Sequence, residues 1–258
     1  SFLAELGNRD DLVICTKAGL TETEFGWPCD VSRRALMGAL DGSLRRLGTD
    51  HIDLWLVHDW SGATPLEETL SALDAAVRSG KARYVGISNY SGWQSAQAAT
   101  WQRAHPERSP LVATEVSYSL VDRRAEAEIL PAAEALGLGV FPWSPLGGGV
   151  LTGKYRRGIP ADSRAAWEPM AGSVEAYLGD DSARIVEAVS RAADGLGWSP
   201  AQVALAWVRD RDGVAAPIVG ARTASQLAEV LATETMELPA EIADALSDVS
   251  AGAAPSGR

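Results

Sequence analysis

The sequence has few of the residues that mark several large classes of protein. It contains two cysteines, Cys15 and Cys29, which excludes a framework of disulfides, and neither has the spacing of a metal-ligand set. No apolar run approaches the ~20 residues of a membrane-spanning helix, and no charged segment leads into an apolar one as in a signal peptide. We therefore expect a cytoplasmic protein with no metal site and no insertion into a membrane.

Basic residues are also in short supply. The 258 residues include 23 Lys and Arg against 34 Asp and Glu, a formal charge of −11, and the basic residues form no patch. Such a chain is repelled by nucleic acids and by anionic membranes. The hydrophobic content of 46% is enough for a large core, in one barrel-sized domain or two smaller ones. A small molecule is the expected partner.

Residues 139–154 carry the first chemical signal. A short apolar run ends at Trp143, then Ser144-Pro145 stops it, and three consecutive glycines precede Lys154. Bare backbone N–H groups beside a lysine suit a phosphate, and a tryptophan at the end of a strand suits the flat face of a ring. A nucleotide cofactor is one interpretation. A core aromatic residue followed by a flexible turn is the other, and this stretch alone leaves both open.

Short apolar strands alternate with helices along the chain. Strands are predicted at residues 11–17, 51–58, 82–89, 111–119, 139–143 and 214–219. Helices are predicted at residues 32–48, 65–80, 93–105, 123–136, 183–196, 200–210 and 223–231, and residues 1–7 read as the end of another. The strands are apolar on both faces, which favours a parallel sheet covered by helices.

An open doubly wound sheet and a closed (β/α) barrel both fit this alternation. The open sheet usually has a Gly-x-Gly-x-x-Gly turn after an early strand, and the sequence has none. Barrels build their sites at the carboxyl ends of the strands. The chemically active residues of this chain lie at those ends: Lys17, His58, Ser88-Asn89, Glu115, Trp143 and Gly220-Ala221-Arg222. The barrel is favoured.

Lys17 and His58 end successive strands. A lysine can change the acidity of a neighbouring acid, and a histidine can orient or donate to a carbonyl oxygen. Taken singly, a lysine at the end of a strand is more often solvated and a histidine among apolar residues more often structural. Their sequence positions alone do not decide between the two roles.

Eight short motifs follow one another along the chain. They are Thr16-Lys17, Leu56-Val57-His58, Gly86-Ile87-Ser88-Asn89, Tyr118-Ser119-Leu120, Trp143-Ser144-Pro145-Leu146, Gly153-Lys154-Tyr155, Ser163-Arg164 and Gly220-Ala221-Arg222. In this order and spacing they resemble the aldo-keto reductases. The resemblance runs from Arg9 to about Leu231 and is nearest to the branch of potassium-channel β-subunits and related bacterial reductases. It implies a single domain over residues 1–258, a (β/α)8 TIM barrel with about six of the eight units present.

The resemblance implies roles at the reactive end of a nicotinamide cofactor. Lys17 and His58 match two members of the family's catalytic tetrad, in which the lysine tunes a tyrosine acid and the histidine places the substrate carbonyl. Ser88 and Asn89 match the pair that holds the carboxamide, and Trp143 matches the aromatic residue stacked on the nicotinamide ring. The expected activity is reduction of an aldehyde or ketone to an alcohol with NADPH.

The resemblance also implies residues at the phosphate and adenosine end. Ser144, Pro145, Leu146 and Gly147 match the loop along the pyrophosphate, Lys154, Arg164 and Arg222 match the basic residues around the adenosine phosphates, and Gly220, Gln226 and Glu229 match residues near the adenine ribose and base. Three cations at one end favour the ribose 2′-phosphate of NADP over NAD. A solvated surface charge is the alternative for each cation.

Two positions depart from the family pattern. Glu115 stands where the family usually has a glutamine against the carboxamide, and a carboxylate accepts hydrogen bonds but donates none unless protonated. Val230 stands where an asparagine that contacts the adenine commonly follows the glutamate. We expect both changes to alter the affinity for the cofactor.

The other two members of the tetrad, an aspartate and the tyrosine acid, come in the family from two strand units that precede anything matching residues 1–7. We therefore expect an amino-truncated reductase with impaired turnover, in which Tyr84 and Tyr118 are no substitutes. The alternative function is a catalytically impaired subunit that binds NADP(H) as a sensor or regulator. A barrel without these two strand units would have unpaired sheet edges, which predict self-association across the gap that the missing strands leave.

Overall fold

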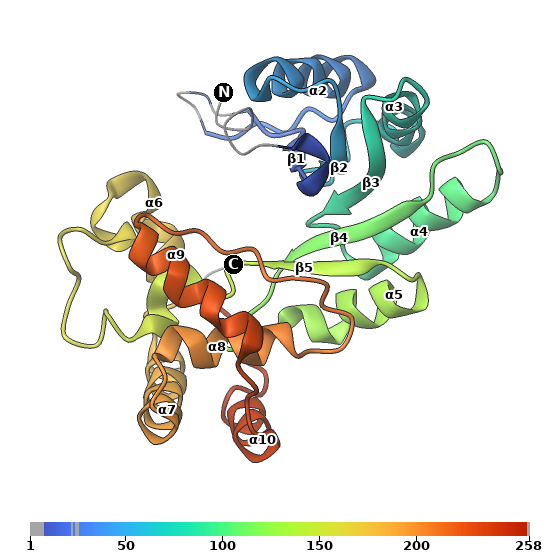
Figure 1. Cartoon of the computed structure of the whole chain (residues 1–258). Helices are drawn as coiled ribbons and strands as arrows, with labels where there is room; N and C mark the ends of the chain where they lie inside the picture. The colour runs from blue at the N-terminus through green and yellow to red at the C-terminus, as the bar shows by residue number, and fades with distance from the viewer. Residues whose placement is uncertain (1–7, 22, 24–25, 257–258) are drawn as a thin grey trace. The chain divides into compact units, whose positions relative to one another are not determined.

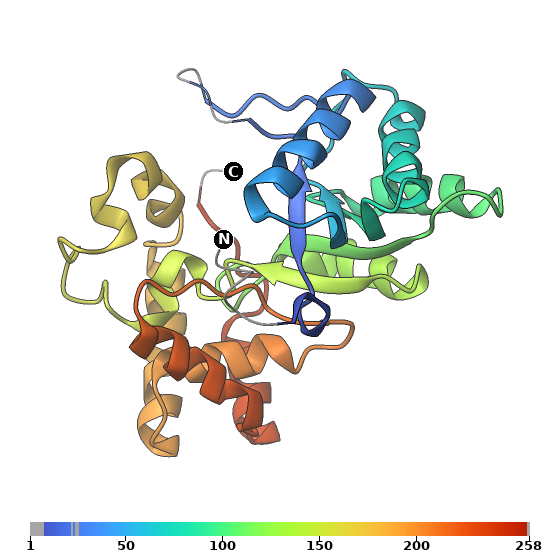
Figure 2. The same ribbon diagram turned by 45° about the horizontal axis from the view of Figure 1, so that its top comes forward.

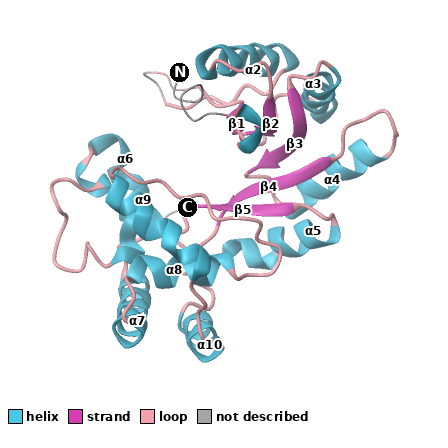
Figure 3. Cartoon of the chain, viewed as in Figure 1, coloured by secondary structure: helices cyan, strands magenta, loops and turns pink. Residues whose placement is uncertain are grey.

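Strands and helices alternate from β1 to β5 in a computed structural model, which describes residues 8–21, 23 and 26–256 (Figures 1 and 3). The helix end expected at residues 1–7 lies outside them. The strands form one five-stranded sheet in the order β1-β2-β3-β4-β5, and β1 to β4 pair in parallel. The predicted α/β alternation is therefore confirmed. None of the described helices is both long and apolar enough to cross a membrane.

The chain divides into two compact units. Unit 1 comprises Ser1–Glu115 and Ile129–Gly139, and unit 2 comprises Val116–Glu128 and Val140–Arg258. The crossing points lie within strands β4 and β5, so each of these two strands contributes residues to both units.

Unit 1 contains the amino-terminal strand and helix pairs. Helices α2 and α3 pack beside each other, α2 against β1 and α3 against β3 (Figures 1 and 2). Its core includes Trp55, Leu70 and Ile87, all fully buried. The elements are the 3₁₀ helix η1 (Arg9–Asp11), β1 (Cys15–Ala18), α2 (Arg33–Leu47), β2 (Ile52–Val57), α3 (Leu66–Arg78), β3 (Ala82–Ser88), α4 (Gly92–Arg103), most of β4 (Leu111–Ser117) and α5 (Ile129–Ala135).

Helix α2 forms where its caps and its apolar spacing predict it. The Ser32 hydroxyl accepts a hydrogen bond from the backbone N–H of Ala35, and Gly48 ends the helix in the left-handed conformation at φ 70°. Leu36 and Leu40 are fully buried. The apolar spacing in the sequence thus predicts the buried face of α2, and the helix packs against β1, the strand that carries Lys17.

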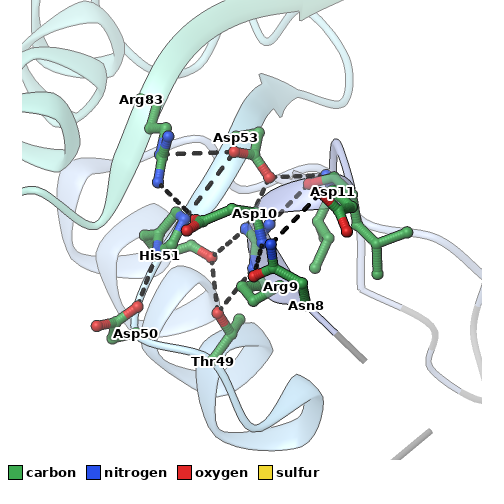
Figure 4. A network of polar contacts seen from close by, with 11 residues as sticks. Asn8, Arg9, Asp10, Asp11, Thr49, Asp50, His51, Asp53 and Arg83 are labelled. Atoms are coloured by element: carbon green, nitrogen blue, oxygen red, sulfur yellow. Dashed lines mark hydrogen bonds and ion pairs between the residues drawn. The ribbon is translucent and has the colours of Figure 1, made fainter. Parts of the chain in front are cut away.

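A polar network holds the start of β1 against β2 (Figure 4). The Arg9 guanidinium donates to Asp53 Oδ2 at 2.6 Å and to the carbonyls of Leu12 and His51 at 2.7 and 3.1 Å. Asp53 also accepts from the backbone N–H of Ile14 at 2.8 Å. Desolvation raises the pKa of Asp53, but the hydrogen bonds from Ile14 and Arg9 lower it overall. The network fixes where strand β1 begins.

The predicted burial of residues 11–17 is only partly correct. Strand β1 begins at Cys15, because residues 9–11 form a 3₁₀ turn, and the side chain of Val13 is 84% exposed. Within the strand, burial rises from the exposed Cys15 to the buried Ala18.

Unit 2 is built mainly from helices. Trp207 lies at its centre: the indole N–H donates to Ser247 Oγ at 3.0 Å, the ring lies 5.7 Å from that of Tyr118, and the guanidinium of Arg123 stacks on it at 4.7 Å. The elements are η2 (Arg124–Ala127), most of β5 (Gly139–Trp143), η3 (Gly147–Thr152), η4 (Arg164–Ala166), α6 (Glu168–Glu175), α7 (Asp180–Leu196), α8 (Pro200–Arg209), α9 (Ala224–Leu231), η5 (Ala232–Thr235) and α10 (Ala240–Val249).

The predicted sixth strand at residues 214–219 is wrong. The segment runs beside β5 and makes hydrogen bonds from Ala215 N to Val140 O and from Ile218 N to Pro142 O, both at 2.8 Å, but only Val214 forms a bridge. Pro217 has no N–H and Pro142 faces it in β5, so a regular ladder is interrupted on both sides. The sixth unit therefore has an extended segment in place of a strand.

The single helix predicted at residues 123–136 is also wrong. A 3₁₀ turn ends at Ala127, Glu128 leaves the helical region at φ −143°, and α5 starts at Ile129. Pro131 explains the break: a proline fits in the first turn of a helix, where no N–H is needed, but its ring clashes with a preceding helical turn. Helices α6 and α10 were not predicted.

Candidate functional site

Side chains from four strands meet at the carboxyl edge of the sheet in unit 1. We call Lys17, His58, Ser88, Asn89 and Glu115 the strand-end cluster. Lys17 lies in β1, His58 directly follows β2, Ser88 ends β3 and Glu115 lies in β4, where it is in register with Ser88. Because the strands are parallel, these ends share one edge, as the barrel prediction requires.

The ammonium of Lys17 forms an ion pair with the carboxylate of Glu115. The Glu115 side chain is 3% exposed and that of Lys17 is 29% exposed, so the pair reaches water only through the lysine. A buried carboxylate needs such a partner, because an unpaired charge in the interior is strongly unfavourable. Lys17 is therefore not the solvated strand end that its sequence position allowed.

Asn89 connects the neighbouring strand ends. Its side-chain amide donates to the carbonyl of His58 at 3.0 Å, and its backbone N–H donates to the carbonyl of Glu115 at 2.9 Å. The backbone of Asn89 has φ 59°, in the left-handed region that asparagine tolerates better than most residues. Asn89 thus fixes the loop after β3 and holds the backbone of His58 in place.

The imidazole of His58 is kept neutral. Desolvation, and secondly the positive charge of Lys17, lower its pKa from 6.5 to about 4. A neutral imidazole at pH 7 donates one hydrogen bond and accepts one, which suits the recognition of a carbonyl oxygen.

The His58 signal should show no protonation between pH 5.5 and 8 in an NMR titration of the three histidines, with His58→Asn as the assignment control. Since the unfolded chain binds this proton below pH 6.5 and the folded chain only near pH 4, stability should fall as the pH drops through that window. The half-buried position limits the loss to about 1–2 kcal/mol. Titration of His58 near pH 6.5 would contradict the assigned environment.

The hydroxyl of Ser88 is buried and has no hydrogen-bond partner among the described residues. Ser88 is fully buried at the end of β3, beside Glu115. Buried hydroxyls are normally paired, so this one is suited to a ligand with a polar group such as an amide. Sequence reasoning placed Ser88 by its motif and did not foresee the unpaired oxygen.

Unit 2 contains a pocket of about 880 Å³, here called the cationic pocket. Lys154, Arg164 and Arg222 line it, with Glu229 as an acidic side chain in the lining. The other predicted residues that line it are Ser144, Pro145, Leu146, Gly220 and Gln226. A pocket with excess positive charge and this volume suits a nucleotide phosphate. Gly147, predicted for the loop along the pyrophosphate, does not line the pocket, and neither does Trp143, which was predicted for the face of the nicotinamide ring.

Two glycines of a left-handed run, Gly148 and Gly149, line the cationic pocket. Gly147, Gly148 and Gly149 have φ of 55°, 64° and 95°. A Cβ on Gly149 would lie 2.7 Å from the ammonium of Lys154, so the missing side chain lets Lys154 lie against the loop. The positive φ values explain why three glycines occur together here.

Replacing Gly147 with alanine should destabilise the chain by about 2 kcal/mol. The added Cβ would lie 2.5 Å from Cγ2 of the buried Val121, and φ 55° is itself unfavourable for alanine. Gly197→Ala is the matched control, because Gly197 has a similar left-handed φ, 68°, but an added Cβ meets nothing within 4 Å. Urea unfolding measures both. Equal losses would show that the contact with Val121 carries no cost.

Helix termini position the remaining side chains of the cationic pocket. The Thr223 hydroxyl caps α9 by accepting from the N–H of Gln226, and Gln226 Oε1 accepts from the N–H of Arg222 at 2.9 Å. Gln202 of α8 donates to the carbonyl of Glu229 at 3.2 Å. The guanidinium of Arg222 is 64% exposed and lies 3.7 Å from Asp162. The backbone of Arg222 is therefore held in place, while its exposed guanidinium can still bind a ligand.

Several lining residues were not predicted, among them Thr152, Ser199, Pro200 and Ala201. The signal for two of them was in the sequence, since Ser199-Pro200 followed by Gln202 is a helix start with a capping box. Its place beside the glycine loop depends on tertiary packing. Among the described residues, no group of three His, Cys, Asp or Glu side chains could hold a metal ion.

Comparison with known proteins decides the family. A sequence model described as the Aldo/keto reductase family matches residues 1–251. The chain belongs to the aldo-keto reductase family. This is a family of oxidoreductases, and the predicted (β/α) TIM-barrel class is confirmed by this membership together with the parallel sheet and its alternating helices.

Individual relatives are similar over most of this chain. The uncharacterized oxidoreductase YrpG of Bacillus subtilis is 41% identical over 83% of the chain and 63% of its own length. L-glyceraldehyde 3-phosphate reductase of Escherichia coli O157:H7 is 37% identical over 86% and 64%. A probable voltage-gated potassium channel subunit beta of Oryza sativa subsp. japonica is 38% identical over 88% and 70%. The chain thus spans less than two thirds of the length of the first two of these relatives.

Proposed function

We propose that the protein binds NADP(H) and reduces an aldehyde or ketone to an alcohol. The cationic pocket is the observation that carries the proposal, because it combines a bare glycine loop with Lys154, Arg164 and Arg222. We assign to it the phosphates of the cofactor, and to Arg222 the ribose 2′-phosphate in particular. Glycine loops and cations of this kind bind phosphates through backbone N–H groups and charge-assisted hydrogen bonds.

The strand-end cluster fits the nicotinamide end. The unpaired Ser88 hydroxyl suits the carboxamide, with Asn89 and Glu115 beside it. The cofactor, when bound, would supply the hydride. The neutral His58 would donate a hydrogen bond to the carbonyl oxygen, and the charge of Lys17 would favour negative charge developing there. The alkoxide formed by hydride transfer would take its proton from water.

A paired experiment tests the proposal. NADPH titrated into the chain should change its tryptophan fluorescence with saturation, and NADPH absorbance at 340 nm should fall on adding a small aldehyde. Failure of NADPH to bind at millimolar concentration would overturn the proposal.

A second candidate is binding of NADP(H) without turnover, as a sensor or regulatory subunit. The similarity to the rice protein described as a probable potassium channel subunit beta favours it. In the same experiment, saturable binding with no loss of NADPH absorbance over a panel of aldehydes and ketones supports this candidate. Measurable turnover eliminates it. A cytoplasmic location and self-association of the chain stay predictions.

A further inference from the structure

Glu115 is an unusual charge for the place it occupies. Its carboxylate is 3% exposed at the end of β4, in register with Ser88 and paired with Lys17. The family that the sequence resembles usually has a glutamine, a neutral amide, at this position. With the carboxylate, the charges of residues 17 and 115 sum to zero, and with an amide they would sum to +1.

The charges of this pair act on the groups around them. The pKa of the Cys15 thiol is raised to about 11, first by desolvation and then by the negative charge of Glu115. Lys17, after desolvation, lowers the pKa of His58. Electric fields in a partly dehydrated site are felt over several ångströms because little water screens them. A ligand bound beside Ser88 would experience the same fields.

We propose that Glu115 makes the site favour the oxidised cofactor over the reduced one. This inference rests on the proposed function, in which the nicotinamide carboxamide lies at Ser88. The nicotinamide ring carries a positive charge when oxidised and none when reduced. A buried carboxylate attracts the charged ring, whereas an amide in its place would leave the charge of Lys17 uncompensated and repel it. Glu115 thus raises the affinity for the oxidised form relative to the reduced form, compared with an amide at this position.

The test compares the affinities for NADP⁺ and NADPH in the original chain and in Glu115→Gln, by isothermal titration calorimetry at pH 7. The ratio of the two dissociation constants should shift against NADP⁺ by about tenfold, the factor that corresponds to about 1.4 kcal/mol. Glu115→Asp, which keeps the charge, should stay near the original ratio. Glu229→Gln in the cationic pocket should change the affinity for both forms by the same factor.

The outcomes separate the inference from the proposed function. If both forms bind and Glu115→Gln leaves their ratio unchanged, the role of Glu115 is overturned while the cofactor assignment stands. If neither form binds to the original chain, both are overturned.

A measurement without cofactor tests the charge of Glu115 directly, provided that the circular dichroism of Glu115→Gln matches that of the original chain. In a Cys29→Ser background, the pH dependence of Cys15 alkylation by iodoacetamide reports the charge at position 115. In Glu115→Gln this profile should shift to lower pH, because a repelling negative charge is removed from beside the thiol. An unchanged profile with unchanged circular dichroism would show that Glu115 carries no effective charge, and would overturn the inference.

Discussion

Replacing Arg222 with alanine is expected to lower the affinity for NADPH about 50-fold and to change the affinity for NADH less than about threefold. The guanidinium is 64% exposed, and its nearest acidic group, Asp162, lies 3.7 Å away. That surface ion pair contributes little to folding, so the stability should change by less than about 0.5 kcal/mol. The loss should therefore appear only with the cofactor that carries the 2′-phosphate.

Arg184→Ala is the matched control for Arg222→Ala. Arg184 is similarly exposed, at 61%, lies 3.6 Å from Asp181 and belongs to unit 2, but it does not line the cationic pocket. Fluorescence titration with NADPH and NADH measures the affinities of the original chain, Arg222→Ala and Arg184→Ala. An equal loss of affinity for NADPH and NADH in Arg222→Ala would contradict the role given to Arg222. Equal effects of the two substitutions on the affinity for NADPH would contradict it as well.

Lys17→Met is expected to lower the free energy of unfolding by about 3 kcal/mol. It leaves the carboxylate of Glu115, 3% exposed, without its partner, and breaking a buried pair by removing one charge typically costs about 3–5 kcal/mol. The partial exposure of Lys17 places the effect at the lower end. The double variant Lys17→Met/Glu115→Gln should recover most of the loss, because the buried charge is then gone.

Lys81→Met serves as the control for a lysine in an exposed pair. Lys81 contacts Asp41 at 2.7 Å, but their side chains are 37% and 42% exposed, so its loss should cost less than about 1 kcal/mol. Urea unfolding at pH 7 compares the variants. Similar losses for Lys17→Met and Lys81→Met would show that burial of Glu115 does not raise the cost.

Local rules predicted the elements that depend on local chemistry. Ser32 and Gly48 set the ends of α2, and the apolar run that ends at Trp143 is strand β5 with the predicted bounds. Two of the errors arose where proline competes with hydrogen bonding. Pro131 breaks the helix expected at residues 123–136, and Pro217 interrupts the strand expected at residues 214–219. In both cases the proline was visible, and its effect on the pattern was underestimated.

The sequence indicated which residues belong to the candidate site, but not which of them contact one another. The glycine loop and Arg222 could be assigned from their sequence motifs, and both lie in the wall of one pocket. The pairing of Lys17 with Glu115 joins positions far apart in the chain, so no local pattern indicates it. The unpaired hydroxyl of Ser88 is likewise a property of packing, because it depends on which groups fail to reach the oxygen.

A crystal structure of the chain with NADP⁺ tests most directly whether the cationic pocket holds the phosphates of the cofactor. We expect the 2′-phosphate within about 3 Å of Arg222 or Lys154 and the pyrophosphate against the glycine loop at residues 147–149. Phosphates bound elsewhere on the chain, or an empty pocket at a concentration that saturates binding in solution, would contradict it.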